Sequence, residues 1–344
     1  MGLENRCSQS IYASVVHVTD RCNFACEHCA ETKGTKDMTP SDFKDVLEWQ
    51  QNPGSKRVVV YGGEVRIHPQ LKEIVGKAKE KNLKVVIFTN GYGMSDPKKT
   101  VNILNELSDM GIDSIAISTD QEHKKYAERK GITIDYKYIG EICNSMIENG
   151  TDVKKGIKGN IEICSAGNAE YVLPLGHAKS LTWKRRMESG LFGYDPKRLK
   201  KLQKQLGKEF SSWYSIAWFS HTCYCNPANL VKRSENSKIK NEVVNWMPHI
   251  NTDKSVTACP FNILPELGSI DNLSAEGAFE KVNSNLLYNI ISHEGPQGVA
   301  RLIGNTSEGK LKEKFIERTP CGLCEDLAET NYSDLQEMID TPKE

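Results

Sequence analysis

The sequence predicts an α/β fold in which helices cover a parallel sheet that forms a barrel or a partial barrel. Two observations predict it. Over the first two-thirds of the chain, short β-branched runs alternate with amphipathic helical stretches, and each repeated unit is long enough for a parallel crossover. The expected strands cover residues 11–18, 57–61, 84–89, 113–118, 159–164 and 171–174. In such a sheet we expect the active site at the carboxyl ends of the strands.

Four helices are expected between these strands, at residues 38–51, 69–81, 96–110 and 135–148. The first has the clearest start, because Thr39 is a good N-cap and Pro40 suits the first helical position. Asp42 completes a pattern similar to a capping box. The second and third carry apolar side chains at helical spacing, which predicts one face packed on the sheet.

The length of 344 residues suggests about two domains. From about residue 211 the pattern changes to a cysteine-bearing loop, a possible hairpin at 246–258 and a helix at 275–293. We therefore expect three parts: an N-terminal segment with the first strand at 1–20, the barrel at 11–210 and a smaller domain at 211–344. A lysine-rich helix is expected at 195–210, whose basic run is either a solvated face or a dock for an acidic partner.

Charge and cysteine content narrow the class of protein. Forty-five Lys and Arg balance 45 Asp and Glu, so no net charge draws the chain to nucleic acid or anionic lipid. No apolar run approaches the roughly 20 residues of a membrane span, and the first ten residues contain no apolar signal core. We expect no membrane or nucleic-acid partner and a cytoplasmic location. In that reducing compartment the 11 cysteines, most of them clustered, point to metal or redox chemistry rather than disulfides.

The first cysteine cluster is Cys22-Asn-Phe-Ala-Cys26-Glu-His-Cys29, directly after the first expected strand. Three thiolates at these spacings can converge on one metal centre. A structural zinc ion requires four ligands, and His28 could be the fourth. On a [4Fe–4S] cube, three cysteines leave one iron open for a substrate. The spacing alone leaves both possibilities open.

The next three strand ends also carry unusual residues. They are Gly62-Gly63-Glu64, Thr89-Asn90-Gly91 and Ser118-Thr119-Asp120, and His123 lies just beyond the third. Paired glycines let a backbone approach a ligand closely, and Glu64 could bind an ammonium group. Their succession after the cysteine loop predicts one shared site.

With these motifs in this order, residues 11–185 resemble the radical S-adenosylmethionine (SAM) superfamily. The resemblance implies a partial (β/α)6 barrel, with Cys22, Cys26 and Cys29 holding a [4Fe–4S] cluster whose free iron binds SAM. It implies that the segment 62–64 binds the methionyl amine, that Ser118 and Asp120 contact the ribose or carboxylate, and that His28 lies near the adenine. The implied cofactor-binding residues are His28, Gly62, Gly63, Glu64, Thr89, Asn90, Ser118 and Asp120.

The reaction implied by the resemblance begins with one-electron reduction of SAM to methionine and a 5′-deoxyadenosyl radical. The radical abstracts hydrogen from an unactivated C–H bond, while the protein positions the target carbon and excludes water and oxygen. A low-potential electron donor of the flavodoxin or ferredoxin type is the implied partner.

The C-terminal cysteines suggest a second metal site. Cys321 and Cys324, with Cys259 and one of Cys223 and Cys225, make four ligands, enough for an auxiliary [4Fe–4S] cluster. This pattern resembles the single-cluster twitch domain of radical SAM dehydrogenases. Zinc and no metal remain the alternatives. Cys225 is preferred as the first ligand because Asn226-Pro227 after it favours a turn.

A closer likeness is to the radical SAM peptide epimerases of the YydG type, carried by residues 175–179, 282–287 and 293–295 and by the terminal Cys-Gly-x-Cys. Those enzymes abstract a Cα hydrogen and return one from a cysteine thiol. Here Pro260 follows Cys259, where they have the donor cysteine. Either the spare thiol of Cys223 and Cys225 is the donor, or the chain has none. The catalytic candidates are Cys223, Cys225, Asp120 and His123.

We therefore expect a radical SAM enzyme that modifies a ribosomally made peptide, by epimerisation or related Cα or side-chain chemistry. The alternative is a radical SAM dehydrogenase or epimerase of a sugar or aminocyclitol. A remote alternative is a zinc-stabilised binding module without catalysis. His17, on the first strand, is expected to be a core histidine.

Overall fold

The computed structural model describes residues 14–26, 29, 34–50, 57–118, 121–148, 156–157, 162–166, 248–257, 266–284 and 287. The chain divides into two compact units. The sheet unit comprises Val15–Glu48 and Lys56–Leu191, and the C-terminal unit comprises Met1–Ser14, Trp49–Ser55 and Phe192–Glu344. The domain boundary expected near residue 210 stays a prediction.

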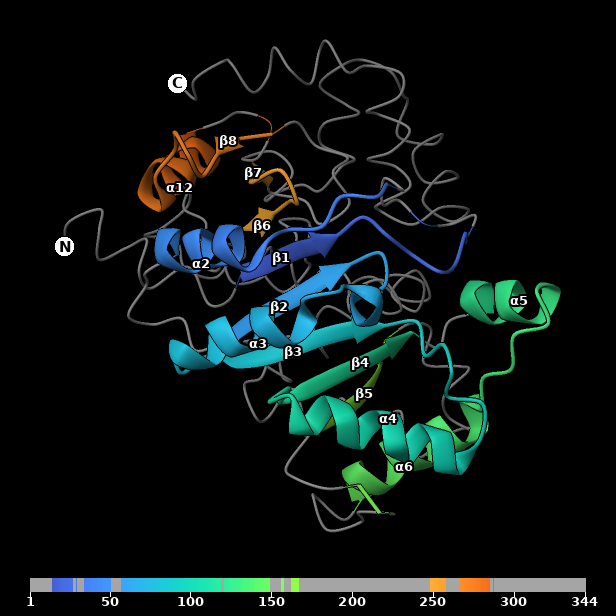
Figure 1. Cartoon of the computed structure of the whole chain (residues 1–344). Helices are drawn as coiled ribbons and strands as arrows, with labels where there is room; N and C mark the ends of the chain where they lie inside the picture. The colour runs from blue at the N-terminus through green and yellow to red at the C-terminus, as the bar shows by residue number, and fades with distance from the viewer. Residues whose placement is uncertain are drawn as a thin grey trace, which may run out of the picture. The chain divides into compact units, whose positions relative to one another are not determined.

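The sheet unit contains five neighbouring strands in the order β5-β4-β3-β2-β1 (Figure 1). Parallel pairing joins β2 to β3, β3 to β4 and β4 to β5. The strand bounds are Ser14–Thr19 for β1, Arg57–Gly62 for β2, Lys84–Thr89 for β3, Ser114–Ser118 for β4 and Glu162–Ala166 for β5. The predicted α/β fold with a parallel sheet is therefore confirmed, and the site-bearing ends of these strands meet at one edge.

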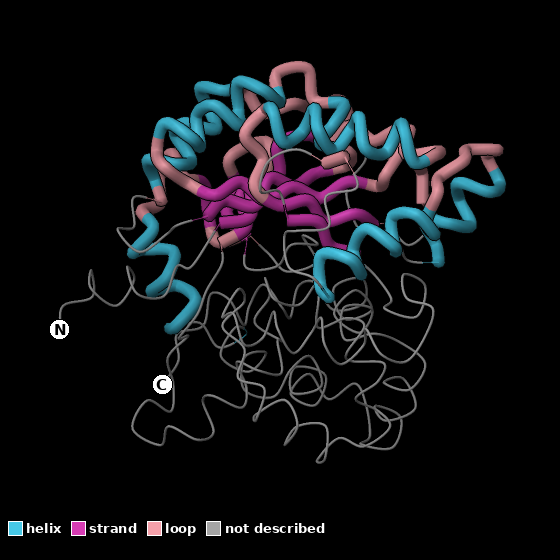
Figure 2. The backbone as a smooth tube through the Cα atoms, turned by 90° about the horizontal axis from the view of Figure 1, so that it is seen from below, coloured by secondary structure: helices cyan, strands magenta, loops and turns pink. Residues whose placement is uncertain are grey.

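Helices accompany the strands of this unit along one face (Figure 2). Their bounds are Pro40–Trp49 for α2, Val65–Ile67 for the 3₁₀ turn η1, Leu71–Glu80 for α3, Pro97–Asp109 for α4, Gln121–Arg129 for α5 and Tyr136–Glu148 for α6. Buried apolar side chains fill the space between the layers. They include Phe43 on α2, Ile74 on α3, Leu104 on α4 and Ile139 on α6, none of which is exposed.

Local sequence explains where these helices begin. The Thr39 hydroxyl donates to Asp42 Oδ2 at 2.7 Å, and the Asp42 amide donates back to Thr39 Oγ1 at 3.1 Å, so the predicted cap of α2 is formed. Asp96 caps α4 by accepting from the Lys99 amide, with Pro97 at the first helical position. Each cap pairs backbone donors that the first turn leaves open.

The C-terminal unit contains the strands β6 (His249–Ile250), β7 (Ser255–Thr257) and β8 (Gly268–Ser269) and the helix α12 (Ala275–Ser284). β6 pairs antiparallel with β7, and β7 with β8. The hairpin expected at 246–258 is therefore present.

Several expectations fall on residues outside the described ranges, including the sixth strand at 171–174 and the lysine-rich helix at 195–210. The closure of a six-stranded partial barrel and a cysteine-bearing auxiliary domain thus stay predictions. α5 was not anticipated. No helix in the described part of the chain has the length and apolar character that a bilayer crossing requires.

Candidate metal and cofactor site

The loop that follows β1 carries the three cysteines Cys22, Cys26 and Cys29, all as thiols rather than disulfides. Cys26 is buried, Cys22 is half-buried and Cys29 is exposed. The Phe24 amide donates to Cys22 Sγ at 3.4 Å, and the Cys29 amide donates to Cys26 O at 3.3 Å. Burial raises the pKa of the Cys22 thiol, an effect that the Phe24 hydrogen bond partly offsets.

The described residues contain no group of three metal-ligating side chains gathered around one point. Sulfurs bound to a single zinc ion at about 2.3 Å would lie within about 4 Å of one another. A cube spreads its ligands, because each of three irons takes one thiolate. The three thiols on one loop are the donor set for a cube with one open iron, whereas a structural zinc ion would need a fourth ligand.

Gly62 and Gly63 bring the end of β2 against the backbone of the cysteine loop. A Cβ at Gly62 would lie 2.5 Å from Thr19 O, and one at Gly63 would lie 2.3 Å from Arg21 O. The Gly63 amide donates to Thr19 O, and the Glu64 amide to Arg21 O, both at 2.8 Å. The paired glycines are thus needed for the close approach of two protein segments, which sets the position of Cys22.

Glu64 is 1% exposed and joins the end of β2 to the end of β3. Its carboxylate accepts hydrogen bonds from the Asn90 amide at 2.7 Å, the Arg66 amide at 3.1 Å and the Thr89 hydroxyl at 2.9 Å. Burial raises the pKa of this carboxyl, although the charge of Arg66 and these hydrogen bonds act in the opposite direction. Both oxygens are already engaged, so an ammonium group of SAM at this carboxylate would have to share an acceptor.

Asn90, after β3, completes the connection to the cysteine loop. Its side-chain Nδ2 donates to Asn23 Oδ1 at 2.8 Å and lies 3.9 Å from Cys22 Sγ. The ends of β2 and β3 are therefore bonded both to each other and to the loop that holds the thiols.

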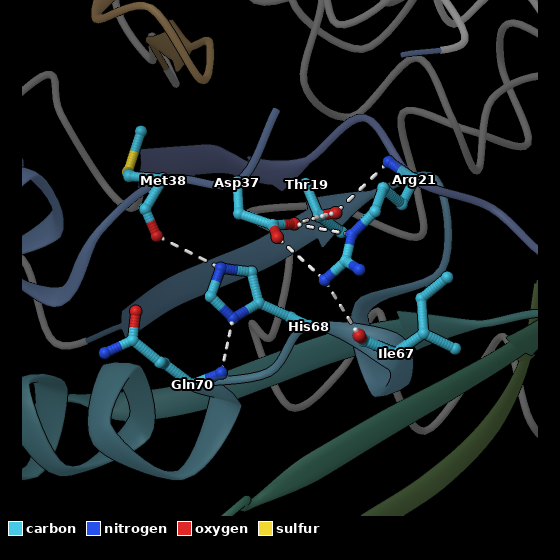
Figure 3. A network of polar contacts seen from close by, with 7 residues as sticks. All are labelled: Thr19, Arg21, Asp37, Met38, Ile67, His68 and Gln70. Carbon is cyan, nitrogen blue, oxygen red and sulfur yellow. Dashed lines mark hydrogen bonds and ion pairs between the residues drawn. The ribbon is translucent and has the colours of Figure 1, made fainter. Parts of the chain in front are cut away.

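A second set of contacts fixes the start of the cysteine loop (Figure 3). The Arg21 guanidinium pairs with the Asp37 carboxylate, with Nη2 2.7 Å from Oδ2 and Nε 3.1 Å from Oδ1. Asp37 Oδ1 also accepts from the Thr19 hydroxyl at 2.6 Å, and Arg21 Nη2 donates to Ile67 O at 3.3 Å. A two-point guanidinium–carboxylate contact is geometrically specific. Arg21 therefore connects the cysteine loop to η1 and to the segment before α2.

His68, which follows Ile67, adds a further contact between the same two segments (Figure 3). Its Nδ1 accepts from the Gln70 amide at 3.0 Å, so the ring proton lies on Nε2, which donates to Met38 O at 3.0 Å. Burial lowers the pKa of His68, although the hydrogen bond to Met38 acts in the opposite direction. The neutral ring therefore suits this position.

Aromatic side chains surround Phe24 of the cysteine loop. Its ring centroid lies 4.9 Å from that of Tyr126, 6.3 Å from that of His123 and 6.4 Å from that of Tyr92. Tyr126 and His123 come from α5, which carries them to the cysteine loop, and Tyr92 follows β3 with 47% of its surface exposed. The sequence candidate His123 is thus beside the loop.

The predicted site residues divide into those that the structure describes and those that it does not. Cys22, Cys26, Cys29, Gly62, Gly63, Glu64, Thr89 and Asn90 lie together as described above. Ser118 ends β4, with 9% of its surface exposed. Residues outside the described ranges are His28, Asp120, Cys223, Cys225, Cys259, Cys321 and Cys324.

Sequence reasoning missed Arg21, Asp37 and His68, which hold the loop without belonging to a motif. The local signal for Arg21 was its charge and its position directly before the first cysteine. Its partner lies 16 residues further on in an irregular segment, so no local spacing connects the two. His17 is 2% exposed, which confirms the expected core position.

Comparison with known proteins shows which proteins this part of the chain is similar to. Residues 16–161 match the model of the Radical SAM superfamily. An S-adenosylmethionine-dependent nucleotide dehydratase from Thermoplasmatales archaeon (strain ISO4-H5) is 30% identical over 92 residues, which are 26% of this chain and 33% of that protein. A probable GTP 3′,8-cyclase from Pyrococcus horikoshii is 28% identical over 162 residues, 46% of this chain and 48% of that protein.

A third relative is the antilisterial bacteriocin subtilosin biosynthesis protein AlbA of Bacillus subtilis, 29% identical over 121 residues, 33% of this chain and 26% of that protein. The chain thus spans about half or less of the length of these relatives. Among solved structures, BtrN in complex with AdoMet and 2-DOIA covers 86% of this chain and 92% of its own, with a TM-score of 0.44 and 15% identity. The match to Streptococcus suis SuiB bound to precursor peptide SuiA covers 83% of this chain and 67% of the SuiB chain, with a TM-score of 0.43 and 11% identity.

Proposed function

Because residues 16–161 match the model of the Radical SAM superfamily, we propose that the chain is a radical SAM enzyme and that it modifies a ribosomally made peptide. The cofactors of the family are a [4Fe–4S] cluster and SAM. When bound, they supply a 5′-deoxyadenosyl radical that abstracts a hydrogen atom from a C–H bond. The proposed cluster ligands are Cys22, Cys26 and Cys29.

The observation that supports this assignment of ligands is the bonding of the cysteine loop to two strand ends. Glu64 and Asn90 fix the ends of β2 and β3 to each other and to residues 21–23. A loop held in this way presents its thiols without a large reorganisation when the cluster binds, which is the preorganisation that such sites need. The segment 62–64 would place SAM beside Cys22, and Ser118 at the end of β4 would contact its ribose or carboxylate.

The peptide substrate rests on two observations. One relative is named for the biosynthesis of a bacteriocin, and the sequence carries the epimerase-like segments at 175–179, 282–287 and 293–295. We propose that Cys259, Cys321, Cys324 and one of Cys223 and Cys225, preferably Cys225, hold an auxiliary cluster. The other thiol of that pair would return hydrogen to the substrate. Asp120 and His123 would contact the substrate near the cysteine loop. A flavodoxin- or ferredoxin-type protein would supply the electrons.

A second candidate substrate is a small molecule that carries a ribose or another sugar-like ring. Two relatives are named for reactions on nucleotides, and the structure of BtrN is reported with AdoMet and 2-DOIA. AlbA and these relatives all match over only part of their length, so the preference for a peptide depends on the epimerase-like segments of the sequence.

The test of this proposal is mass spectrometry of short peptides encoded beside the gene, after anaerobic incubation with the reconstituted enzyme, SAM and a strong reductant. Epimerisation predicts an unchanged mass in H2O and the uptake of one deuterium in D2O at the modified residue. Loss of two hydrogens would instead indicate oxidation or a new bond. If no peptide changes and SAM cleavage is stimulated only by a nucleotide or an aminocyclitol, the small-molecule candidate replaces the peptide.

A further inference from the structure

Asn90 has a fixed orientation because three of its groups are bonded. Its amide donates to Glu64 Oε2 at 2.7 Å, and its Oδ1 accepts from the Tyr92 amide at 3.0 Å. A backbone N–H is always a donor, so the side-chain oxygen of Asn90 must face Tyr92. The side-chain nitrogen then faces Asn23 and Cys22.

This orientation in turn fixes Asn23. Asn90 Nδ2 donates to Asn23 at 2.8 Å, so the Asn23 atom that faces it must be the oxygen. Flipping Asn23 would set two NH2 groups against each other. The remaining group, Asn23 Nδ2, is buried and has no hydrogen-bond partner among the described residues.

A buried donor without an acceptor destabilises a protein by about 1–3 kcal/mol. Such a group in a native structure needs an explanation, and a bound ion or cofactor that accepts its hydrogen bond is one. Asn23 is the neighbour of Cys22 in sequence, and Cys22 Sγ already has two N–H groups beside it. They are the Phe24 amide at 3.4 Å and Asn90 Nδ2 at 3.9 Å. Two donors thus lie at the first proposed ligand, and the unpaired Nδ2 belongs to the residue that follows it in sequence.

We propose that Asn23 and Asn90 are an amide pair that donates N–H···S hydrogen bonds to the Cys22 side of the bound [4Fe–4S] cluster and raises its reduction potential. The inference rests on the proposed ligation by Cys22. Hydrogen bonds to cluster sulfurs are one of the factors that set the potential of such a cluster. They stabilise the more negative, reduced form more than the oxidised form. The amide pair therefore makes the cluster easier to reduce.

The experiment is a redox titration of the EPR signal of the reduced cluster, without SAM, in the wild type and Asn23→Ala. At a fixed potential we expect the ratio of reduced to oxidised cluster to fall about tenfold in the variant, a shift of about 59 mV for one electron. Asn105→Ala is the matched control, because Asn105 is also half-buried and its Nδ2 donates to Gly156 O at 3.1 Å, away from the cysteine loop. Its titration curve is expected to overlay that of the wild type.

Iron content, measured on the same samples, separates this inference from the proposed cluster itself. Iron at the wild-type level with an unchanged midpoint potential in Asn23→Ala would overturn the inference and leave the cluster standing. An unchanged midpoint together with weakened SAM binding would also overturn it and assign Asn23 Nδ2 to the SAM carboxylate. If Asn23→Ala fails to take up iron, Asn23→Ser, which keeps a hydroxyl donor, is expected to restore uptake. Failure of both variants would show that Asn23 acts through its shape, not its hydrogen bond.

Discussion

At the scale of single residues, buried polar side chains connect the loops around the cysteines. Glu64, His68 and Asn90 are 1%, 4% and 5% exposed. Glu64 and His68 bond to backbone groups of another segment, and the Asn90 side chain bonds to that of Asn23 in the cysteine loop. Removing one partner would leave a buried donor or acceptor unpaired, which is more costly than the hydrogen bond is favourable. The positions of these loops therefore depend on buried polar side chains.

The pH dependence of stability tests His68. Its pKa is lowered in the folded state by burial, so the unfolded state binds more protons as the pH falls below the ordinary value of 6.5. The contribution of His68 is complete above this value and is lost as the pH falls towards the folded-state pKa. Urea unfolding of the wild type should therefore show a loss of stability between about pH 7.5 and pH 5.5. His68→Gln should show a flatter profile over that range, and equal slopes would contradict this role.

The Arg21–Asp37 contact gives a second prediction at this scale. Both side chains are partly exposed, at 36% and 24%, so the ion pair alone stabilises the fold by about 1 kcal/mol or less. Asp37→Asn should nevertheless speed the release of iron to a chelator several-fold under anaerobic conditions, because it loosens the start of the cysteine loop. Glu80→Gln is the matched control, since it breaks the exposed Lys77–Glu80 pair on α3. Equal release rates for all three proteins would exclude a role for Asp37 in holding the loop.

At the scale of elements, the close approach of the β2 end to the cysteine loop depends on the absence of a side chain. A Cβ at Gly63 would lie 2.3 Å from Arg21 O and 2.7 Å from Arg21 C, both backbone atoms that cannot move without shifting the loop. Gly63→Ala should therefore abolish iron uptake after anaerobic reconstitution or prevent folding.

Gly76→Ala on α3 is the control for this change, because nothing lies within 4 Å of a Cβ added there. An alanine in the interior of a helix should stabilise the protein by about 0.5–1 kcal/mol. Thermal unfolding of both variants distinguishes a local from a global effect. Wild-type iron uptake in Gly63→Ala would contradict the proposed contact between β2 and the loop.

The elements that sequence predicts well are those with a regular apolar pattern. β3 has the predicted bounds Lys84–Thr89, since its β-branched run ends at Asn90-Gly91. α5 was missed because Gln121–Arg129 is mostly polar and has no stripe of apolar residues. Its place is set by Tyr126 and Ala127, which pack against Phe24 and Cys26 of the distant cysteine loop. Such tertiary packing leaves no periodic signal.

At the scale of the whole molecule, the chain combines a segment that matches the model of the Radical SAM superfamily, residues 16–161, with a C-terminal unit whose cysteines lie outside the described residues. The motifs at the strand ends were readable because the chemistry requires fixed residue types in a fixed order. The contacts that position them were not readable, since Arg21 and Asp37 or Glu64 and Asn90 meet only after the sheet has formed. The sequence therefore shows the motifs at the strand ends but not the contacts that position them.

The central claim is that Cys22, Cys26 and Cys29 hold a [4Fe–4S] cluster, with a second cluster in the C-terminal unit. The measurement that tests it most directly is the iron and sulfide content of the wild type and of the triple Cys22→Ala, Cys26→Ala, Cys29→Ala variant after anaerobic reconstitution. The account predicts about eight irons per wild-type chain and about four in the variant. An equal iron content in the two proteins, or zinc in place of iron in the wild type, would contradict it.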